Sequence, residues 1–276
     1  GANRGIGRAA ARTMAGAGAR VVLAVRDTAK GEEAAAAIGG TTEVRRLDLA
    51  DLASVRAFAA GWSDPIDVLV NNAGVMAVAE GKTKDGFETQ IGTNHLGHFA
   101  LTNLLLPHIA DRVVTVSSTA HKMGRIDLDD LNWERRNYNS WRAYGQSKLA
   151  NLLFTLELQR RLTTAGSAVR AFTVHPGYAA TNLQSRTGSR VGNLIGLIGN
   201  HIIAQSDEQG SEPTVYAATQ DLAPNAFVGP DGFQEMRGKP ALVSPTKAAL
   251  DDDMARGLWE RSEELTGVAF PALAAA

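Results

Sequence analysis

The chain has 276 residues, 44% of them hydrophobic, so it can bury a full core, and we expect a single domain over residues 1–276. Lys and Arg total 28 against 29 Asp and Glu, without a basic run, which argues against DNA, RNA or anionic lipid as a partner. There is no cysteine, which excludes disulfides, thiol catalysis and thiolate metal sites. No secretory leader and no apolar run of roughly 18 residues occurs. We expect a soluble, cytoplasmic protein without a membrane span.

The first residues, Gly1-Ala-Asn-Arg-Gly-Ile-Gly7, predict a glycine turn that opens a helix from Ile6 to about Ala17. Such a turn brings backbone N–H groups close to a pyrophosphate, because glycine has no Cβ to block the approach. A plain glycine-rich turn is the alternative, and the buried β-run 20–25 that follows argues against it. The turn needs a strand before it, so we expect one upstream of Gly1, between the strands that begin near Val21 and Ile66.

Cofactor choice depends on the end of the β-run 20–25. An acidic residue there would bind the adenosine ribose of NAD, whereas Arg26, together with Arg4 in the glycine turn, offers two cations to a 2′-phosphate. These residues favour NADP(H) over NAD(H). The alternative is that Arg26 is a surface charge paired with Asp27 or Glu32.

Two further strands end in polar turns. A helix over 28–38 precedes a strand over 44–47 that ends in Asp48, where a carboxylate can contact an adenine, and Asp51 has the position of an N-cap for the next helix. The strand 66–70 runs into Asn71-Asn-Ala-Gly74, which leaves room for a flat ligand, with the Asn side chains pinning the backbone. A plain β-turn is the alternative.

A helix is expected over roughly 85–106. Asn94 is a poor helix former in its middle, which indicates a polar role for its side chain. His95 and His98 are three residues apart, as metal ligands can be, but no third ligand is at suitable spacing. Packing positions are therefore favoured over a metal site.

Ser117 and Ser118 end the predicted strand 112–118, at the edge where open α/β sheets hold ligands. After a surface excursion over 121–140, Tyr144 and Lys148 stand four apart on a helix, so an ammonium can favour the ionised form of a phenol. A half-buried aromatic and a solvated Lys are the plain alternative for this common pattern. The leucines that follow on the same helix either form a subunit contact, as in a homodimer or homotetramer, or are buried in their own domain.

The strand 169–174 leads into Pro176 and Gly177, which bend the chain at the ligand edge and bring Thr181 within reach of the same site. The regular pattern loosens over 184–209, and within this stretch the run 191–203 is apolar and broken by glycines. It is interpreted as a flap over an apolar substrate, with a membrane-surface helix as the alternative. A helix over 208–219, a short strand near 241–243 and a helix over 249–265 complete the chain.

These motifs, in this order and spacing, closely resemble the short-chain dehydrogenase/reductase family. The match spans nearly the whole chain. The stretches 94–99, 116–121, 147–151 and 258–264 resemble the retinol dehydrogenase and protochlorophyllide reductase branch more loosely. The resemblance implies a doubly wound α/β (Rossmann) fold, with a mostly parallel sheet flanked by helices.

The resemblance also implies roles for individual residues. Tyr144 would be the general acid/base, Lys148 would lower its pKa and hold the nicotinamide ribose, Ser118 would bind the substrate oxygen, and Asn94 would hold a water that relays protons. The implied cofactor-binding residues are Gly1, Asn3, Arg4, Gly5, Ile6, Gly7, Arg26, Asp48, Leu49, Asn72, Ala73, Gly74, Tyr144, Lys148, Pro176, Gly177 and Thr181.

The expected function is an NADP(H)-dependent oxidoreductase acting on a small apolar alcohol, ketone or aldehyde. Two alternatives remain open at this point. One is an NADP(H)-binding redox sensor without turnover, and the other is a reductase of a C=C bond, which would use the same Tyr and Lys.

Overall fold

The computed structural model describes residues 1–177 and 206–273. Within these residues the strands are β1 (Val21–Val25), β2 (Thr42–Arg46), β3 (Ile66–Asn71), β4 (Ile109–Val116), β5 (Arg170–Val174), β6 (Phe227–Pro230) and β7 (Pro240–Leu242). The α-helices are α1 (Gly5–Gly16), α2 (Thr28–Ile38), α3 (Leu52–Ala60), α4 (Thr89–Ile91), α5 (Gly97–Leu105), α6 (Ser140–Thr164), α8 (Asp207–Thr219) and α9 (Asp252–Thr266). A π-helix over Gly92–Leu96 joins α4 to α5, and 3-10 turns lie at Leu106–His108, Thr119–Met123, Phe233–Glu235 and Lys247–Leu250.

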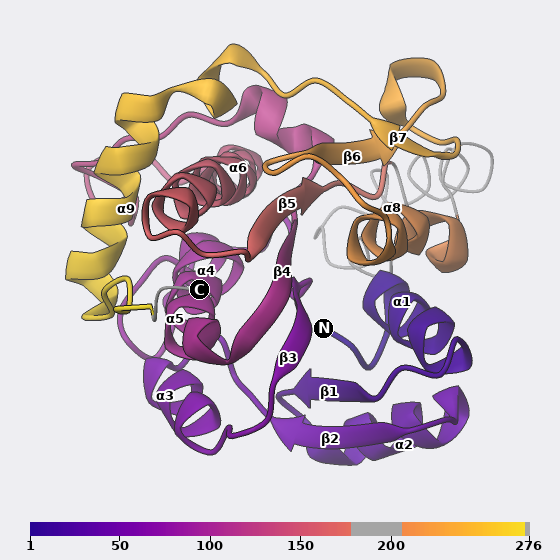
Figure 1. The fold of residues 1–276 in the computed structure, drawn as a ribbon. Helices are drawn as coiled ribbons and strands as arrows, with labels where there is room; N and C mark the ends of the chain where they lie inside the picture. Colours follow the sequence, from indigo (N-terminus) through magenta and orange to yellow (C-terminus); the bar gives the residue numbers. More distant parts are fainter. Residues whose placement is uncertain (178–205, 274–276) are drawn as a thin grey trace, which may run out of the picture.

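The described strands form two groups. β1 and β2 pair in parallel, while β3, β4, β5 and β6 form a parallel sheet that β7 extends antiparallel at its edge. The predicted doubly wound, mostly parallel fold is confirmed. β1 and β3 are not paired with each other, and Figure 1 shows the N-terminus between them. The strand expected at this place would lie outside the sequence, so it stays a prediction.

The parallel register places the ends of three neighbouring strands side by side. Asn71 pairs with Thr115, and Val116 pairs with Val174. The segments that follow β3, β4 and β5 therefore leave the sheet at the same edge, as predicted. This edge receives the polar side chains of the candidate site.

Helices cover both faces of the sheet. In Figure 1, α5, α6 and α9 lie on one side, and α1 and α8 lie on the other. Leu153, Leu158 and Leu162 of α6 are fully buried, the last two in the same core cluster as Trp259 of α9. Burying each such side chain is worth about 1.5–3 kcal/mol. Burial within the chain thus accounts for the apolar surface of α6, one of the two alternatives from the sequence.

Several boundaries differ from the sequence prediction. The helix expected to begin near residue 85 begins at Thr89, because the buried carboxylate of Glu88 caps it by accepting from Gln90 N and Ile91 N. β6 was missed, since it is four residues long and contains a Gly and a Pro. Asp51 caps α3 as predicted, accepting from Ala53 N.

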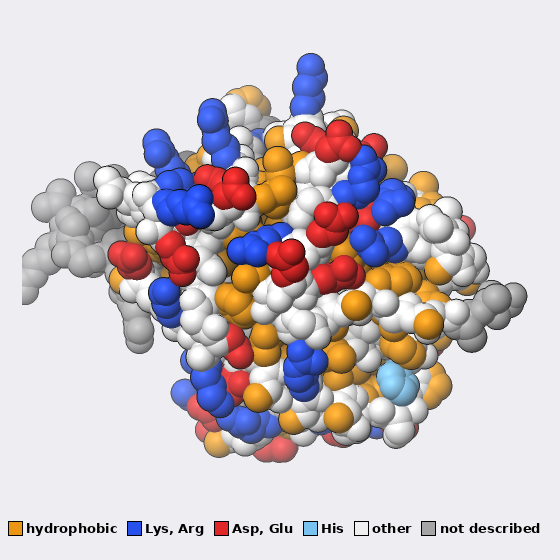
Figure 2. All heavy atoms as spheres, turned by 90° about the vertical axis from the view of Figure 1, so that its left-hand side faces the viewer, with side chains coloured by type: hydrophobic (Ala, Val, Ile, Leu, Met, Phe, Trp, Pro, Cys, Tyr) orange, Lys and Arg blue, Asp and Glu red, His pale blue; other side chains and the backbone are white. Residues whose placement is uncertain are grey.

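The molecular face that carries α9 has mixed charge. Figure 2 shows acidic and basic side chains intermingled there, without a large field of one sign. On α9 itself, Arg261 pairs with Glu264 at 2.5 Å and Arg256 pairs with Asp253. None of the described helices combines the length and the apolar character that crossing a bilayer requires.

Candidate active site

The side chains of Tyr144 and Lys148 lie one turn apart on α6 and are almost fully buried, with 8% and 4% of their surfaces exposed. Lys148 Nζ donates to Val116 O over 3.0 Å and lies 5.7 Å from the centre of the Tyr144 ring. Ser117, at the end of β4, donates its hydroxyl to Lys148 O, which fastens α6 to the strand end. Lys148 is therefore buried, whereas the plain alternative expected a solvated Lys.

The ionisation of this pair is dominated by burial. Burial raises the pKa of Tyr144 to about 12, and a hydrogen bond with the Ser118 side chain partly opposes this shift. Burial also lowers the pKa of Lys148 to about 8. The role expected of Lys148, lowering the pKa of Tyr144, stays a prediction, since desolvation of the phenol is the largest effect on its pKa here and raises it. At neutral pH the phenol carries its proton.

Asn94 lies on the π-helix and is fully buried. Its Oδ1 accepts from Val75 N at 2.8 Å, and its Nδ2 donates to Val75 O at 2.9 Å and to Ser147 Oγ at 2.9 Å. The polar role predicted for its side chain is thus to hold the segment after Gly74 against α6. The wide turn of a π-helix, frequent at functional sites, orients this amide.

Three residues that the sequence analysis did not single out extend this support. Gln90 accepts from Ala77 N at 2.8 Å and donates to Tyr138 Oη at 2.9 Å. The Tyr138 hydroxyl has two acceptors for its one proton, Val78 O at 3.1 Å and Glu88 Oε1 at 3.2 Å. Their signal was weak, since Glu88 and Gln90 read as the polar start of a helix and Tyr138 as part of a surface excursion.

The N-terminus of α1 is open to an anion. No acidic residue lies in its first turn and no side chain caps it, which leaves the N–H groups there for a ligand. Gly5 has φ +57°, and a Cβ on Gly7 would lie 2.2 Å from Gly1 O. Asn72 Nδ2 donates to Gly1 O at 3.3 Å and pins the turn, as expected of this Asn pair. Asn3 and Ile6 are half-buried in the same turn.

Arg4 and Arg26 are both exposed, Arg4 within this turn as the residue before α1 and Arg26 directly after β1. Asp27, one proposed partner of Arg26, instead caps α2 and pairs with Lys30 at 3.1 Å. Within residues 1–177 and 206–273, Arg26 has no ion pair. The surface-pair alternative for Arg26 is thus not what the structure shows.

The other predicted cofactor residues lie on neighbouring turns. The carboxylate of Asp48 accepts from Ala50 N at 3.0 Å, which orders the turn after β2, and Leu49 is buried next to it. Ala73 is partly buried against the core. A Cβ on Gly74 would lie 3.2 Å from Asn94 Oδ1 and 3.5 Å from Lys148 Nζ, so this turn lies close to both groups.

Pro176 and Gly177 follow β5 at the same edge, both half-buried, and Gly177 has φ +70°. Thr181 and most of the expected flap, residues 184–205, lie outside the described residues. Residues 206–209 are instead the N-cap and the first residues of α8. One edge of the sheet thus carries a glycine turn, two arginines, a phenol and an ammonium. This set of hydrogen-bond donors and cations fits a dinucleotide.

His95 and His98 are buried with separate partners. His95 Nε2 lies 2.9 Å from Ser262 Oγ, and His98 Nδ1 lies 3.0 Å from Asn94 O. In the described part of the chain no three His, Asp or Glu side chains are grouped as metal ligands. The packing interpretation holds for both histidines.

These histidines should make the fold sensitive to mild acid. Burial lowers the pKa of His95 to about 3 and that of His98 to about 4, from 6.5. The unfolded chain then binds more protons between pH 6.5 and 4, so stability is full above pH 6.5 and falls as the pH drops through that range. At pH 5 each histidine should cost about 2 kcal/mol. His95→Gln keeps a hydrogen-bond partner for Ser262. Between pH 7 and pH 5 its free energy of unfolding in urea should fall by less than that of the parent. An equal fall in both proteins would show that His95 is not a source of the acid sensitivity.

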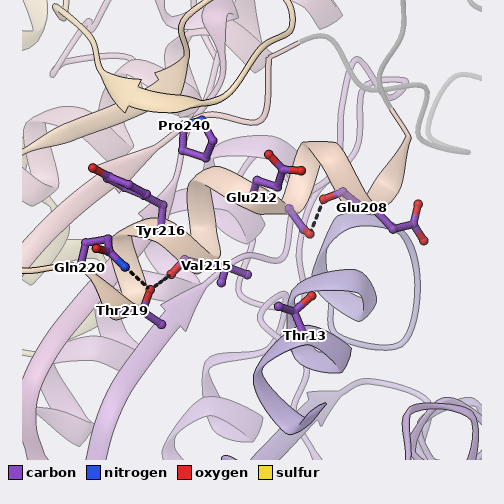
Figure 3. Close-up of a pocket in the computed structure, with 9 residues that line it drawn as sticks. Thr13, Glu208, Glu212, Val215, Tyr216, Thr219, Gln220 and Pro240 are labelled. Carbon is purple, nitrogen blue, oxygen red and sulfur yellow. Dashed lines mark hydrogen bonds between the residues drawn. The ribbon is translucent and has the colours of Figure 1, made fainter. Parts of the chain in front are cut away.

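A pocket of about 400 Å³ lies elsewhere, between α1, α8 and the start of β7. Figure 3 shows Thr13 of α1 on the side of α8 that carries Val215, while the side chain of Glu212 points away from α1. No residue predicted for catalysis or cofactor binding lines it. The Thr219 hydroxyl donates to Val215 O, so part of its polar lining is already satisfied.

Comparison with known proteins decides the family. The family model for short chain dehydrogenases matches residues 1–191. The chain belongs to the short-chain dehydrogenase/reductase family. As a family member it is an oxidoreductase whose fold binds a nicotinamide cofactor.

The relatives of this short-chain dehydrogenase/reductase include retinol dehydrogenases. It is 42% identical to human retinol dehydrogenase 13 (Homo sapiens), over 99% of this chain and 85% of that protein. It is 45% identical to mouse retinol dehydrogenase 12 (Mus musculus), over 97% of this chain and 85% of that protein. The resemblance to the retinol dehydrogenase branch is thereby confirmed.

Two solved structures are also similar. An uncharacterised protein from Mycobacterium paratuberculosis has 54% identity and a TM-score of 0.85, over 98% of this chain and 92% of that one. The closed form of serine dehydrogenase complexed with NADP+ has 25% identity and a TM-score of 0.64, over 80% of this chain and 88% of that one.

Proposed function

We propose that this chain is an NADP(H)-dependent oxidoreductase that interconverts an apolar alcohol and its ketone or aldehyde. The observation that carries the proposal is the buried Tyr144, beside Ser118 and one turn from Lys148, at the sheet edge that also presents the open N-terminus of α1. The similarity to retinol dehydrogenases supports an alcohol substrate.

Each part of the cofactor has candidate partners. The N–H groups of residues 5–7 would hold the pyrophosphate, and Arg4 and Arg26 the 2′-phosphate. Lys148 and the Pro176–Gly177 turn would hold the nicotinamide half. The bound nicotinamide would supply or accept the hydride.

The protein's own chemistry is proton transfer. With its pKa raised to about 12, Tyr144 holds a proton that it can donate to a substrate oxygen during reduction. Ser118 would hydrogen-bond to the same oxygen. In oxidation Tyr144 must accept the proton, which requires its phenolate, so oxidation should accelerate as the pH rises.

An apolar substrate is supported by two exposed side chains, one beside Tyr144 and one beside the next residue of α6. The Trp141 side chain is 47% exposed, and its ring lies edge-on to that of Tyr144 at 6.3 Å between centres. Met123 is 55% exposed, and its Cγ lies 2.9 Å from where a Cβ on Gly145 would be. Exposed apolar groups that flank a reacting phenol suit a substrate with an apolar body.

The test is an assay that follows the absorbance of the reduced nicotinamide with NADPH and a panel of apolar aldehydes and ketones, and with NADP+ and retinol. Turnover at a carbonyl or alcohol carbon supports the proposal. A saturated C=C bond in the product would assign the alternative reductase chemistry. Tight NADPH binding without turnover on any substrate would favour the redox-sensing alternative.

Arg26→Asp should reverse the cofactor preference. The change removes a phosphate partner, adds a group that repels the 2′-phosphate and provides an acceptor for a ribose hydroxyl. NADP(H) binding should weaken roughly tenfold to hundredfold, while NAD(H) binding should change little or improve. Calorimetric titration with both cofactors measures the two dissociation constants.

Arg4→Ala should act in the same direction with a smaller effect, since it removes a cation without adding an anion. Arg261→Asp on α9 is the matched control and should leave both constants unchanged. If Arg26→Asp and Arg4→Ala both kept the parent preference for NADP(H), the phosphate assignment would be wrong.

A further inference from the structure

His175 immediately precedes the Pro176–Gly177 turn and is fully buried. Its Nδ1 accepts a hydrogen bond from Gly177 N at 3.2 Å. A neutral imidazole that accepts through Nδ1 carries its proton on Nε2. The nearest carboxylate is that of Glu235, whose Oε2 lies 3.1 Å from Nε2.

Glu235 is held in an unusual backbone conformation. Gln234 and Glu235 have φ of 51° and 57°, in the left-handed region that costs non-glycine residues of the order of 1 kcal/mol or more. Glu235 Oε2 also lies 3.3 Å from Lys122 Nζ, four residues after Ser118. The carboxylate thus bridges the segment after β4 and the segment after β5.

The contact between His175 and Glu235 lacks the geometry of a hydrogen bond. In the described residues neither Glu235 Oε2 nor His175 Nε2 has a partner with hydrogen-bond geometry, although both atoms are buried. A buried carboxylate oxygen and a buried N–H group at 3.1 Å gain from better alignment. Contacts that are poorly aligned without ligand often tighten when the ligand binds.

The imidazole ring has no room to move away. A Cβ on Gly229 of β6 would lie 2.0 Å from His175 Nε2, so the ring occupies the space that this glycine leaves. The ring also packs on Phe227 at 5.2 Å between centres, and His175 N donates to Val228 O. β6 therefore packs against the imidazole on the side opposite its contact with Gly177 and prevents the ring from moving away.

We infer that His175 and Glu235 are positioning residues for the nicotinamide half of the cofactor, which act by fixing the backbone of the Pro176–Gly177 turn. This rests on the proposed function. β5 is the neighbour of β4, whose end carries Ser118, so the turn lies near the reacting groups. Arg4 and Arg26 belong to the other end of the dinucleotide.

A matched pair of variants isolates the contact to Gly177. His175→Asn and His175→Leu have nearly the same shape and both lose Glu235, but only Asn retains an acceptor where Nδ1 was. Binding is measured by calorimetry with NADPH and with adenosine 2′,5′-bisphosphate, a fragment that keeps the adenine, its ribose and the 2′-phosphate but has no nicotinamide half. We expect His175→Leu to weaken NADPH binding about tenfold and His175→Asn to weaken it about threefold or less, with the fragment unchanged in both.

Glu235→Gln tests the second half of the bridge without removing a ring from the core. It should weaken NADPH binding about threefold to tenfold and leave the fragment unchanged. Glu264→Gln, which breaks an exposed pair on α9, is its control and should bind both molecules like the parent. If His175→Leu does not fold, Glu235→Gln carries the test.

Equal weakening of NADPH and the fragment would overturn the inference, because it would indicate general damage. Parent-like NADPH binding by His175→Leu and Glu235→Gln would also overturn it. A parent protein that neither binds NADPH nor turns over substrate would instead refute the proposed function, so the two failures are distinguishable.

Discussion

Tyr144→Phe is expected to lower kcat by roughly 10²–10⁴-fold while leaving NADPH binding within about a factor of two. The change removes one oxygen from a side chain that is 92% buried and leaves its ring in place. Without that oxygen the Ser118 hydroxyl would be the remaining donor to the substrate oxygen. Ser118 would contact the substrate, but a serine hydroxyl does not release its proton at neutral pH, so it should not replace the phenol.

The measurement combines steady-state kinetics with calorimetric NADPH titration. Tyr216→Phe on α8 is the matched control and should have parent kinetics, since Tyr216 is remote from the reacting groups and lines the pocket of Figure 3. A Tyr144→Phe protein with near-parent kcat would remove the basis of the proposed function.

Lys148→Met is expected to lose turnover and weaken NADPH binding about tenfold or more, because it removes a cation from the buried site. The same variant should be more stable than the parent. Since burial lowers the pKa of Lys148 from 10.5 to about 8, holding it charged at pH 7 costs the fold about 3 kcal/mol, a cost that falls as the pH rises from 8 to 10.5.

Urea unfolding at pH 7 and pH 10 measures this cost. The gain in stability of Lys148→Met over the parent should be large at pH 7 and smaller at pH 10. Lys84→Met, which changes an exposed Lys paired with Asp51, should alter stability by less than about 1 kcal/mol and leave kinetics unchanged. A Lys148→Met protein less stable than the parent at pH 7 would show that the ammonium stabilises the fold.

The sequence predicted the features whose signal is local. Neighbouring residues alone indicate the β-runs near Val21 and Ile66, the cap at Asp51 and the spacing of Tyr144 and Lys148. The structure contains each of these features. The upward shift of the Tyr144 pKa was missed, because residue spacing shows which groups are adjacent and not how much water reaches them.

Contacts between distant segments could not be predicted either, because residue spacing shows only which groups are adjacent along the chain. His175 and Glu235 are 60 positions apart, and nothing in either segment indicates that they meet. Likewise, Gln90 reaches Ala77 and Tyr138 across two loops. The π-helix at Gly92–Leu96 has no periodic signature, since its apolar residues fit an ordinary amphipathic helix equally well.

That π-helix also has a consequence for sequence alignments with relatives and for deletions of single residues in this helix. A π turn holds about one residue more than an α turn, so α4 and α5 are offset by about 100° around their common axis. Deleting Thr93 would let the backbone relax into continuous α-helix, which the main chain should tolerate well, but it would rotate Asn94 away from Val75. In an alignment with a relative that lacks the extra residue, a one-residue gap belongs between Gly92 and Asn94, even where ungapped similarity scores higher.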